Sequence, residues 1–452
     1  MLHFGTDGVR GVAIDELTPE LARDLARATS RVLQPVAVVI GRDTRESGPA
    51  LEKAIIDGCA AEGVPVYLLG VAPTPAVAFA SERNGWVGIA ITASHNSWSD
   101  NGIKVFASGG VKLDDAEQIE IERVWHALTA ETAPVALGTV HDASHIVAEY
   151  ATHRFNVIGG SLAGLSVVLD CAHGAMSSVA AEVFHVAGAS VEVINASPNG
   201  RNINEQCGAT SPQALAQHVI ASRADLGIAF DGDGDRVGVV TNKGHIVYPD
   251  RLMMLFALDV LSRNPGADII YDVKCSRLLH QVLEQAGGKP QMWKTGHSLI
   301  KARMKATGAL LAGEMSGHFF FSERWFGFDD GIYAAARLLE ILAAAPEGIQ
   351  AKFDELPKLV STPELKAEVA EGEQHAFIAR FVEQARFEGA RISLIDGVRA
   401  DWPYGWGLVR ASNTTPVLVL RFEANDEAAL SRIQAAFRMQ LLALKPDLNL
   451  PF

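Results

Sequence analysis

The pattern of apolar and polar residues repeats three times along the first three quarters of the chain. Each repeat begins with a short apolar run that ends in an aspartate, at residues 38–43, 167–170 and 269–272. A stretch with helical apolar spacing, a glycine and a second short apolar run then follow. Strand, helix and strand in this order form a βαβ unit with two parallel strands. The pattern therefore predicts three related α/β domains with mixed sheets.

The pattern changes near residue 357. Beyond it, short apolar runs typical of strands are separated by two helical stretches, at 375–385 and 427–444. Strands that are grouped together, with a helix on either side, favour an α+β domain with an antiparallel sheet. The whole chain is therefore predicted to form four domains, with the boundaries 1–144, 145–245, 246–356 and 357–452.

Composition and charge then exclude several classes of protein. The net charge of -14 argues against a protein that binds nucleic acid or anionic membranes, because both need a basic surface. No apolar run reaches the length of a membrane span, and residues 1–8 lack the pattern of a signal peptide. The 4 cysteines lie far apart, without the spacing of a zinc site or a disulfide framework. We therefore expect a cytoplasmic protein with reduced cysteines.

A polar loop between two predicted strands contains the first candidate for chemistry. The loop is Thr-Ala-Ser-His-Asn at 92–96, and it places His95 next to Ser94 and Lys104 on the returning strand. A serine in this setting can carry a covalent group during a reaction. The alternative is an ordinary polar turn, in which the Ser94 side chain forms a hydrogen bond with the backbone. The glycine-rich segment 4–11 poses the same choice, since its Arg10 could bind phosphate or simply face solvent.

Three aspartates alternate with two glycines after the apolar run 226–230. They are Asp231, Asp233 and Asp235. Carboxylates at this spacing repel one another unless a cation lies between them, and oxygen ligands favour Mg²⁺ over a thiophilic metal. A solvated hairpin turn is the alternative, but such a turn rarely needs three acids. We therefore expect a magnesium site here.

Two further loops offer groups for binding a ligand. Gly-Glu-Met-Ser-Gly-His at 313–318 combines donors and acceptors that suit sugar hydroxyls, although a tight turn explains its glycines equally well. Arg-Ala-Ser-Asn-Thr-Thr-Pro at 410–416 could hold a phosphate, or could be a capped turn that ends at the proline. Lys274 and His297 lie in loops that also follow predicted strands. Alone, neither residue indicates a site, and both become candidates only together with these motifs.

Taken in order, the four loops resemble the signatures of the α-D-phosphohexomutase superfamily over essentially the whole chain. The resemblance implies a central cleft between the four domains, the last of which is similar to TATA-binding-protein folds. It implies that Ser94 is a phosphoserine and ligates the metal together with the three aspartates. The implied sugar contacts are Glu314, Ser316 and His318, and the implied phosphate contacts are Arg410, Ser412, Asn413 and Thr414. Further residues match positions that the family uses around the reaction centre, namely Arg10, His95, Lys104, Arg236, Lys274 and His297.

The resemblance also implies an activity. It is the interconversion of hexose 6-phosphate and hexose 1-phosphate through a bisphosphorylated sugar, with Mg²⁺ and a hexose 1,6-bisphosphate activator, in a monomer or homodimer. Either His297 or Lys274 would accept the proton of the sugar hydroxyl. Where the family usually has a proline after the Ser-His-Asn, this chain has Ser97 and then Trp98, and we expect a less rigid loop.

The substrate is indicated less directly. Segments 4–11 and 198–210 resemble phosphoglucosamine mutases, whereas 294–301, 313–318 and 410–424 resemble bacterial phosphomannomutase/phosphoglucomutases. Because the second group includes the loops expected to contact the ligand, we predict mannose and glucose phosphates, with glucosamine 6-phosphate as the alternative. A magnesium-dependent sugar phosphatase and a non-catalytic sugar-phosphate sensor are the hypotheses from other classes.

Overall fold

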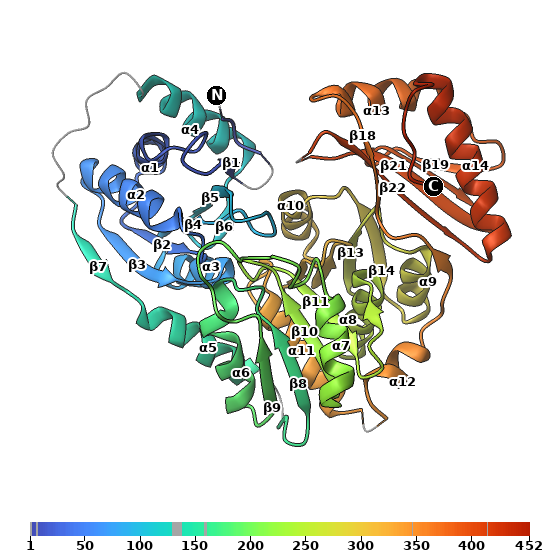
Figure 1. Cartoon of the computed structure of the whole chain (residues 1–452), viewed down its shortest axis with the longest axis horizontal. Helices are drawn as coiled ribbons and strands as arrows, with labels where there is room; N and C mark the ends of the chain where they lie inside the picture. Colours follow the sequence, from blue (N-terminus) through green and yellow to red (C-terminus); the bar gives the residue numbers. More distant parts are fainter. Residues whose placement is uncertain (1, 6–7, 129–137, 158–160, 346, 414) are drawn as a thin grey trace. The chain divides into compact units, whose positions relative to one another are not determined.

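The computed structural model describes the chain except residues 1, 6–7, 129–137, 158–160, 346 and 414 (Figure 1). The chain divides into two compact units. Unit 1 consists of Met1–Leu252 and Ser316–Phe353, and unit 2 consists of Met253–Met315 and Asp354–Phe452. Among the described residues, no helix has both the length and the apolar character needed to cross a bilayer.

The first sheet of unit 1 is mixed. Its strands lie in the order β1-β5-β4-β2-β3-β7, with β6 paired to β5. Strand β2 is parallel to β3 and β4, whereas β5 is antiparallel to β4 and β1. The strands are β1 (Val9–Val12), β2 (Val38–Arg42), β3 (Val66–Val71), β4 (Val87–Ile91), β5 (Asp100–Ala107), β6 (Val111–Lys112) and β7 (Val140–Asp142). The helices of this part are α1 (Pro19–Leu33), α2 (Gly48–Ala61), α3 (Thr74–Asn84), α4 (Asp115–Leu128) and α5 (His145–Val157).

Local sequence explains how these elements form. Strand β4 is apolar and buried throughout, as expected for a strand covered on both faces. Helix α1 begins after Thr18, whose side chain accepts the N–H of Leu21, and it ends at Gln34 in the left-handed conformation. Helices α1, α2 and α4 share one apolar core with the central strands. This core supports the strand ends from which the loop 92–99 extends.

The second sheet of unit 1 has the order β12-β11-β10-β8-β9. Strand β8 is parallel to β9 and β10, and the β10–β11 hairpin carries the aspartate loop at its tip. The strands are β8 (Ser166–Asp170), β9 (Ser190–Ile194), β10 (Leu226–Phe230), β11 (Val237–Thr241) and β12 (Ile246–Val247). The short helices here are η1 (Ala175–Ser178), α6 (Ala180–Val186) and α7 (Gln213–Ser222). Unit 1 also contains β16 (Phe319–Phe321) and α11 (Gly331–Ala343).

Unit 2 contains the third repeat and the antiparallel sheet. Strands β13 (Asp268–Asp272), β14 (Lys289–Trp293) and β15 (Leu311–Gly313) are parallel, with helices α9 (Arg277–Gln285) and α10 (His297–Thr307). Helices α8 (Pro249–Arg263) and α12 (Ile349–Asp354) each run across a boundary between the units. The three βαβ repeats read from the sequence are therefore present, as β2-α2-β3, β8-α6-β9 and β13-α9-β14.

The C-terminal sheet is antiparallel, as predicted, in the order β17-β22-β21-β20-β19 with β18 paired to β22. Helices α13 (Glu373–Gln384) and α14 (Glu427–Leu444), drawn in orange and red in Figure 1, pack on it through an aromatic core. Its strands are β17 (Val360–Ser361), β18 (Leu365–Glu368), β19 (Arg391–Ser393), β20 (Val398–Trp402), β21 (Gly405–Ala411) and β22 (Val417–Ala424). The loop between β21 and β22 carries residues 412–416.

Candidate active site

The Ser94 side chain points at the acidic loop of the second sheet. Its hydroxyl donates to a carboxylate oxygen of Asp231 at 2.7 Å and lies 3.3 Å from Nδ1 of His95. The Ser94 backbone has the left-handed conformation, with φ of 52°, which residues other than glycine rarely adopt. Its N–H donates to the Thr92 hydroxyl at 2.8 Å. The loop thus holds an uncommon backbone conformation that directs the serine toward the aspartates.

A buried ion pair between Arg45 and Asp43 holds the backbone of the Ser94 loop. The Arg45 guanidinium donates to the carbonyls of Ser94 at 3.0 Å, Asn96 at 2.9 Å and Asp100 at 2.9 Å, and also to the carbonyl of Ser97. Its Nε donates to Asp43 at 2.9 Å, and both side chains are fully buried. Asp43 also accepts the Thr92 hydroxyl at 2.7 Å. Arg45 therefore organises several carbonyls of the loop at once.

Asp43 and Arg45 were not predicted as site residues from the sequence, although one signal pointed to the aspartate. Asp43 is the acid that closes the first repeat, and Asp170 and Asp272 close the second and third. Asp170 accepts the N–H of Ala172 at 3.0 Å and that of Gly208 at 2.9 Å, and Asp272 accepts the N–H of Lys274 at 3.2 Å. The repeated acid thus marks a side chain that fixes the loop after the strand.

The loop between β9 and α7, next to the second sheet, also supports the Ser94 loop. The Asn204 amide donates to the carbonyls of Ser94 at 2.9 Å and Asn96 at 3.1 Å. The backbone of Gly232 also approaches closely, since a Cβ atom there would lie 2.6 Å from the Ser94 carbonyl oxygen. A Cβ on Gly174 would in turn lie 2.3 Å from the Gly232 carbonyl oxygen. Only glycine permits these backbones to meet.

Ser97 and Trp98, the departures from the family pattern, make contacts of their own. The hydroxyls of Ser97 and Ser99 lie 2.6 Å apart. The Arg201 guanidinium lies 5.0 Å from the centre of the Trp98 ring and pairs with Glu46 at 2.6 Å. These contacts brace the loop at the position where the family usually has a proline.

The three aspartates form a compact acidic group. Asp231, Asp233 and Asp235 are all buried, and one carboxylate oxygen of each lies within 4.8 Å of the others. The Lys104 ammonium lies 2.8 Å from Asp233 and 2.8 Å from Asp235. Arg236 lies 3.5 Å from Asp231. Buried carboxylates therefore outnumber the cations in contact with them.

The charge balance alters the acidity of the three carboxyl groups. Burial first, and then the neighbouring Asp235 charge, raise the pKa of Asp231, and the same two causes raise the pKa of Asp233 to about 7. Burial also opposes ionisation of Asp235, but Lys104 and His318 outweigh it and hold that pKa below its usual range. An additional cation beside Asp231 and Asp233 would lower these two raised pKa values.

The donor set fits a hard divalent cation. All three ligands are carboxylates, and among the described residues the Oδ1 atom of Asp233 has no hydrogen-bond partner. Buried polar atoms without a partner are rare and often mark an ion or water site. Magnesium prefers oxygen ligands of this kind.

His318 lies beside the acidic group. Its Nε2 is 3.3 Å from Asp235 and its Nδ1 is 2.8 Å from the Ser316 hydroxyl. Ser316 and His318 thus belong to unit 1, whereas Glu314 belongs to unit 2, where it accepts the Gly296 N–H at 2.6 Å. The predicted sugar-binding motif is therefore divided between the two units.

His95 and Arg10 also lie at the Ser94 loop. An Arg10 guanidinium N–H donates to the Ala93 carbonyl at 3.4 Å. The charge of Arg236, then burial, Arg10 and His318 lower the pKa of His95 to about 2. The imidazole of His95 is therefore neutral at neutral pH, so it can accept or donate a hydrogen bond without adding charge.

Unit 2 collects the remaining predicted residues around paired charges. Lys274 lies 2.9 Å from Glu364 and 3.7 Å from Asp272. Burial lowers the pKa of Lys274, but Glu364 and Asp272 outweigh burial and raise it above its usual value. His297 is the first residue of α10 and is buried. Lys274 therefore remains an ammonium group, and this form cannot accept a proton.

Strand β21 is tied to the loop before α10. Arg410 donates to Asp396 at 2.8 Å, and the same carboxylate oxygen accepts the Thr295 N–H at 3.0 Å. Ser412 and Thr415 hydroxyls lie 3.0 Å apart, and Asn413 is exposed. Thr414 lies outside the described residues. Asp396, which was not predicted from the sequence, thus links β21 to that loop.

Comparisons with known proteins match nearly the whole chain. Sequence profiles of the phosphoglucomutase/phosphomannomutase family match four successive parts of the chain, the α/β/α domains I, II and III at residues 1–132, 146–244 and 248–360 and the C-terminal domain at 349–440. The expected four domains of α/β character with mixed sheets are thereby confirmed.

Several relatives cover nearly the whole chain. A phosphomannomutase/phosphoglucomutase of Pseudomonas syringae pv. tomato is 46% identical over 99% of this chain and 97% of its own length. A phosphoglucosamine mutase of Moorella thermoacetica is 39% identical over 96% of this chain and 98% of its own. A crystal structure of a phosphoglucomutase/phosphomannomutase family protein from Burkholderia thailandensis matches with a TM-score of 0.89 at 42% identity, covering 99% of both chains. The chain therefore belongs to the phosphoglucomutase/phosphomannomutase family of the α-D-phosphohexomutase superfamily.

Proposed function

We propose that this protein interconverts the 6-phosphates and 1-phosphates of mannose and glucose through a phosphorylated Ser94 and a bisphosphorylated sugar. The observation that carries the proposal is the 2.7 Å hydrogen bond from the Ser94 hydroxyl to Asp231 within the buried acidic group. A phosphoryl group on this oxygen would lie beside the carboxylates. Full-length relatives named phosphomannomutase/phosphoglucomutase support the same activity.

Mg²⁺ is the proposed cofactor. Asp231, Asp233 and Asp235 would hold it together with an oxygen of phosphorylated Ser94. When bound, the ion supplies positive charge that offsets the charge of a transferring phosphoryl group. A hexose 1,6-bisphosphate is the proposed activator, because it can restore the phosphate of an enzyme molecule that has lost it.

The other residues of unit 1 orient the serine and offset charge. Arg45 and Asn204 hold the carbonyls of the Ser94 loop, and such preorganisation reduces the reorganisation needed during phosphoryl transfer. Lys104, Arg236 and Arg10 supply positive charge near the serine. His95 is proposed to hydrogen-bond the reacting group as a neutral imidazole. Ser316 and His318 would contact the sugar.

The residues of unit 2 are proposed to bind and to accept a proton. Because Lys274 is held as an ammonium group, we assign it to binding of ligand oxygens and assign His297 as the general base for the sugar hydroxyl. Glu314 would bind the sugar. Arg410, Ser412, Asn413 and Thr414 would bind the phosphate that is not being transferred.

The proposed setting is the cytoplasm. All four cysteines are buried thiols, and burial raises the pKa values of Cys59, Cys171 and Cys207 to about 12. Unreactive thiols of this kind fit a reducing compartment. The proposed partner is a small phosphosugar rather than a nucleic acid or a membrane, as the net charge of -14 suggests, in an enzyme that is a monomer or homodimer.

Replacing Ser94 by alanine tests the proposal directly. With glucose 1-phosphate and catalytic glucose 1,6-bisphosphate, Ser94→Ala is expected to lower kcat at least about 10³-fold, because no other group can carry the phosphate. Ser97→Ala, an exposed serine in the same loop, is the matched control and should retain activity. Near-normal turnover by Ser94→Ala would refute the serine phosphate.

Substrate comparison tests the choice of sugar. Turnover of mannose, glucose and glucosamine 6-phosphates is measured on one preparation, together with release of inorganic phosphate. We expect the first two to be preferred and no net phosphate release. A preference for glucosamine 6-phosphate would favour the activity named for the Moorella relative. Stoichiometric phosphate release would instead identify a phosphatase.

A further inference from the structure

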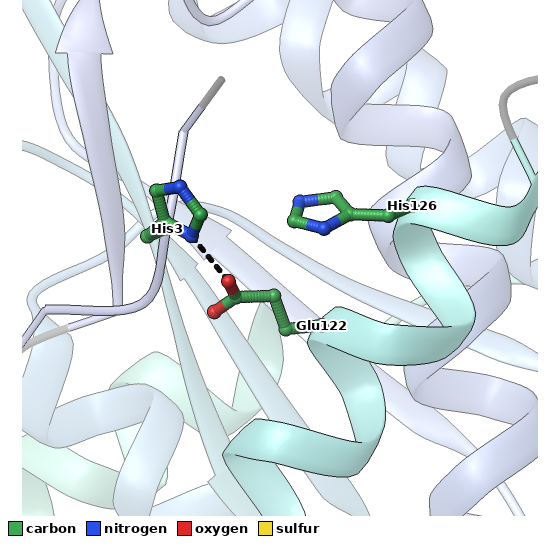
Figure 2. Close-up of side chains that lie close together, drawn as sticks. All are labelled: His3, Glu122 and His126. Carbon is green, nitrogen blue, oxygen red and sulfur yellow. Dashed lines mark hydrogen bonds and ion pairs between the residues drawn. The ribbon is translucent and has the colours of Figure 1, made fainter.

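A second group of possible metal ligands lies in unit 1, among residues that the proposed reaction does not use. His3 belongs to the segment before β1, and Glu122 and His126 belong to α4. One ligand atom of each residue lies within 4.8 Å of the others. Figure 2 shows His3 meeting the Glu122 carboxylate while the His126 ring lies beside them. Side chains far apart in the sequence thus converge on one point.

Helix geometry and hydrogen bonds set the positions of the three side chains. Glu122 and His126 are four residues apart on α4 and therefore lie on one face of the helix. One Glu122 oxygen contacts Nδ1 of His3, and the other accepts the Phe4 N–H at 3.2 Å. The rings of His3 and His126 lie 5.6 Å apart at 88°. The carboxylate is thus fixed between the start of the chain and the second imidazole.

The helix that carries two of these residues is itself anchored. Trp125, next to His126, is buried in the core of the first sheet, and its indole N–H donates to the Leu21 carbonyl of α1 at 3.0 Å. The side chains of His3 and Glu122 are 65% and 23% exposed, so an ion can reach them from solvent. A firmly held helix face and an accessible carboxylate are suitable for a small metal site.

The donors define the class of ion. Two imidazole nitrogens and one carboxylate oxygen are the ligand set of many zinc sites, in which water completes a tetrahedron. First-row divalent cations bind imidazole more tightly than Mg²⁺ does, since Mg²⁺ prefers oxygen ligands. We propose that His3, Glu122 and His126 bind a divalent transition-metal ion such as Zn²⁺, at a site distinct from the aspartates.

The site would join the first residues of the chain to α4. The segment after His3 leads into β1, which pairs with β5, the strand that carries Lys104. A metal bound by both parts stabilises the folded state, because the unfolded chain does not hold the ligands together. The proposal does not depend on the mutase activity, and its failure would leave the proposed function untouched.

The test is a Zn²⁺ titration of the full-length protein, prepared without a polyhistidine tag and freed of metal with a chelator. Titrations are run by calorimetry at pH 7.5 in excess Mg²⁺, so that the acidic group is already saturated with a hard ion. The variants are His3→Gln and His126→Gln. The matched control is His218→Gln, which removes an imidazole that lies 2.7 Å from Glu192 but belongs to no ligand group of three among the described residues.

We expect wild type and His218→Gln to bind one equivalent of Zn²⁺ and to melt at a higher temperature with it. Both His3→Gln and His126→Gln should bind at least about tenfold more weakly and lose the rise in Tm. Because His3 is exposed, His3→Gln should fold even if the half-buried His126 cannot be replaced. Absence of Zn²⁺ binding by wild type in Mg²⁺, or unchanged binding by His3→Gln, would overturn the proposal and leave only a hydrogen bond between His3 and Glu122.

Discussion

The two compact units of this mutase balance their buried charges differently. In unit 1, three buried aspartates face one lysine directly, with Arg236 at a longer distance. In unit 2, Lys274 has Glu364 and Asp272 as partners, and Arg410 has Asp396. Unit 1 therefore gathers three carboxylates into one group that can hold a cation, whereas the acids named in unit 2 each lie beside Lys274 or Arg410.

The difference separates metal binding from phosphate binding. Buried carboxylates that outnumber their cations are stable only if they are protonated or if another cation joins them, which is what a metal-assisted phosphoryl transfer needs. Paired cations cost less to bury. Among the described residues, Arg410 donates to Asp396 through its Nε, and the remaining guanidinium N–H groups can meet a phosphate. Substitution of the residues that hold the Ser94 loop should therefore affect stability and kcat, and substitution of Arg410 should affect KM.

The largest effect is expected from Arg45→Met. The change leaves Asp43 buried without its charged partner and should lower the free energy of unfolding by about 3–5 kcal/mol, measured by urea denaturation. The double variant Asp43→Asn with Arg45→Met should recover some of this loss, since it removes the unpaired charge. If Arg45→Met unfolds at the wild-type urea concentration, the ion pair does not hold the Ser94 loop.

Arg410→Met is the corresponding test in unit 2. Loss of a charged hydrogen bond to the phosphate, about 1.5–3 kcal/mol, should raise KM about 10–100-fold while kcat changes little. Asp396→Asn keeps the arginine and should change KM much less. A fall in kcat at unchanged KM would show that Arg410 acts in the chemical step, which would contradict its assignment to phosphate binding.

The pH dependence of magnesium activation sharpens the contrast further. Because the pKa of Asp233 is raised to about 7, this ligand must lose a proton before it binds metal. The half-saturating Mg²⁺ concentration should therefore rise by up to about tenfold per pH unit below pH 7. Without metal, the same shift removes stability as pH rises from about 4 to 7, because unfolded aspartate is already ionised there. Half-saturation that stays constant between pH 6 and 8 would contradict this account.

Asn204→Gly should give the smallest effect. Asn204 has φ of 60°, so glycine preserves the backbone while it removes the donors to the Ser94 and Asn96 carbonyls. We expect kcat to fall about 3- to 10-fold, as for the loss of one or two ordinary hydrogen bonds. Gln206→Gly, an exposed residue with φ of 54° in the same loop, is the control. Equal losses in the two variants would assign the effect to loop flexibility.

The sequence allowed the repeats and the motif loops to be predicted, because strand, helix and strand follow one another closely and the motifs are contiguous. The residues that support these loops could not be predicted, because Arg45, Asn204 and Asp396 contact loops that lie far away in the sequence. Strand β7 was not predicted either, because its residues are exposed and show no apolar pattern. Residues 313–318 are contiguous in the sequence, so nothing in the motif indicates that the boundary between the two units falls inside it.

The close approach at Gly232 limits how this enzyme can be altered. A library that aims to change its preferred sugar should keep residues 174 and 232 invariant, because any larger side chain there would push neighbouring loops apart before it could touch a substrate. Diversity introduced instead at the half-buried Ser316, a proposed sugar contact, leaves that backbone contact intact. The room for adaptation in this enzyme thus lies away from the point where its loops are tightest.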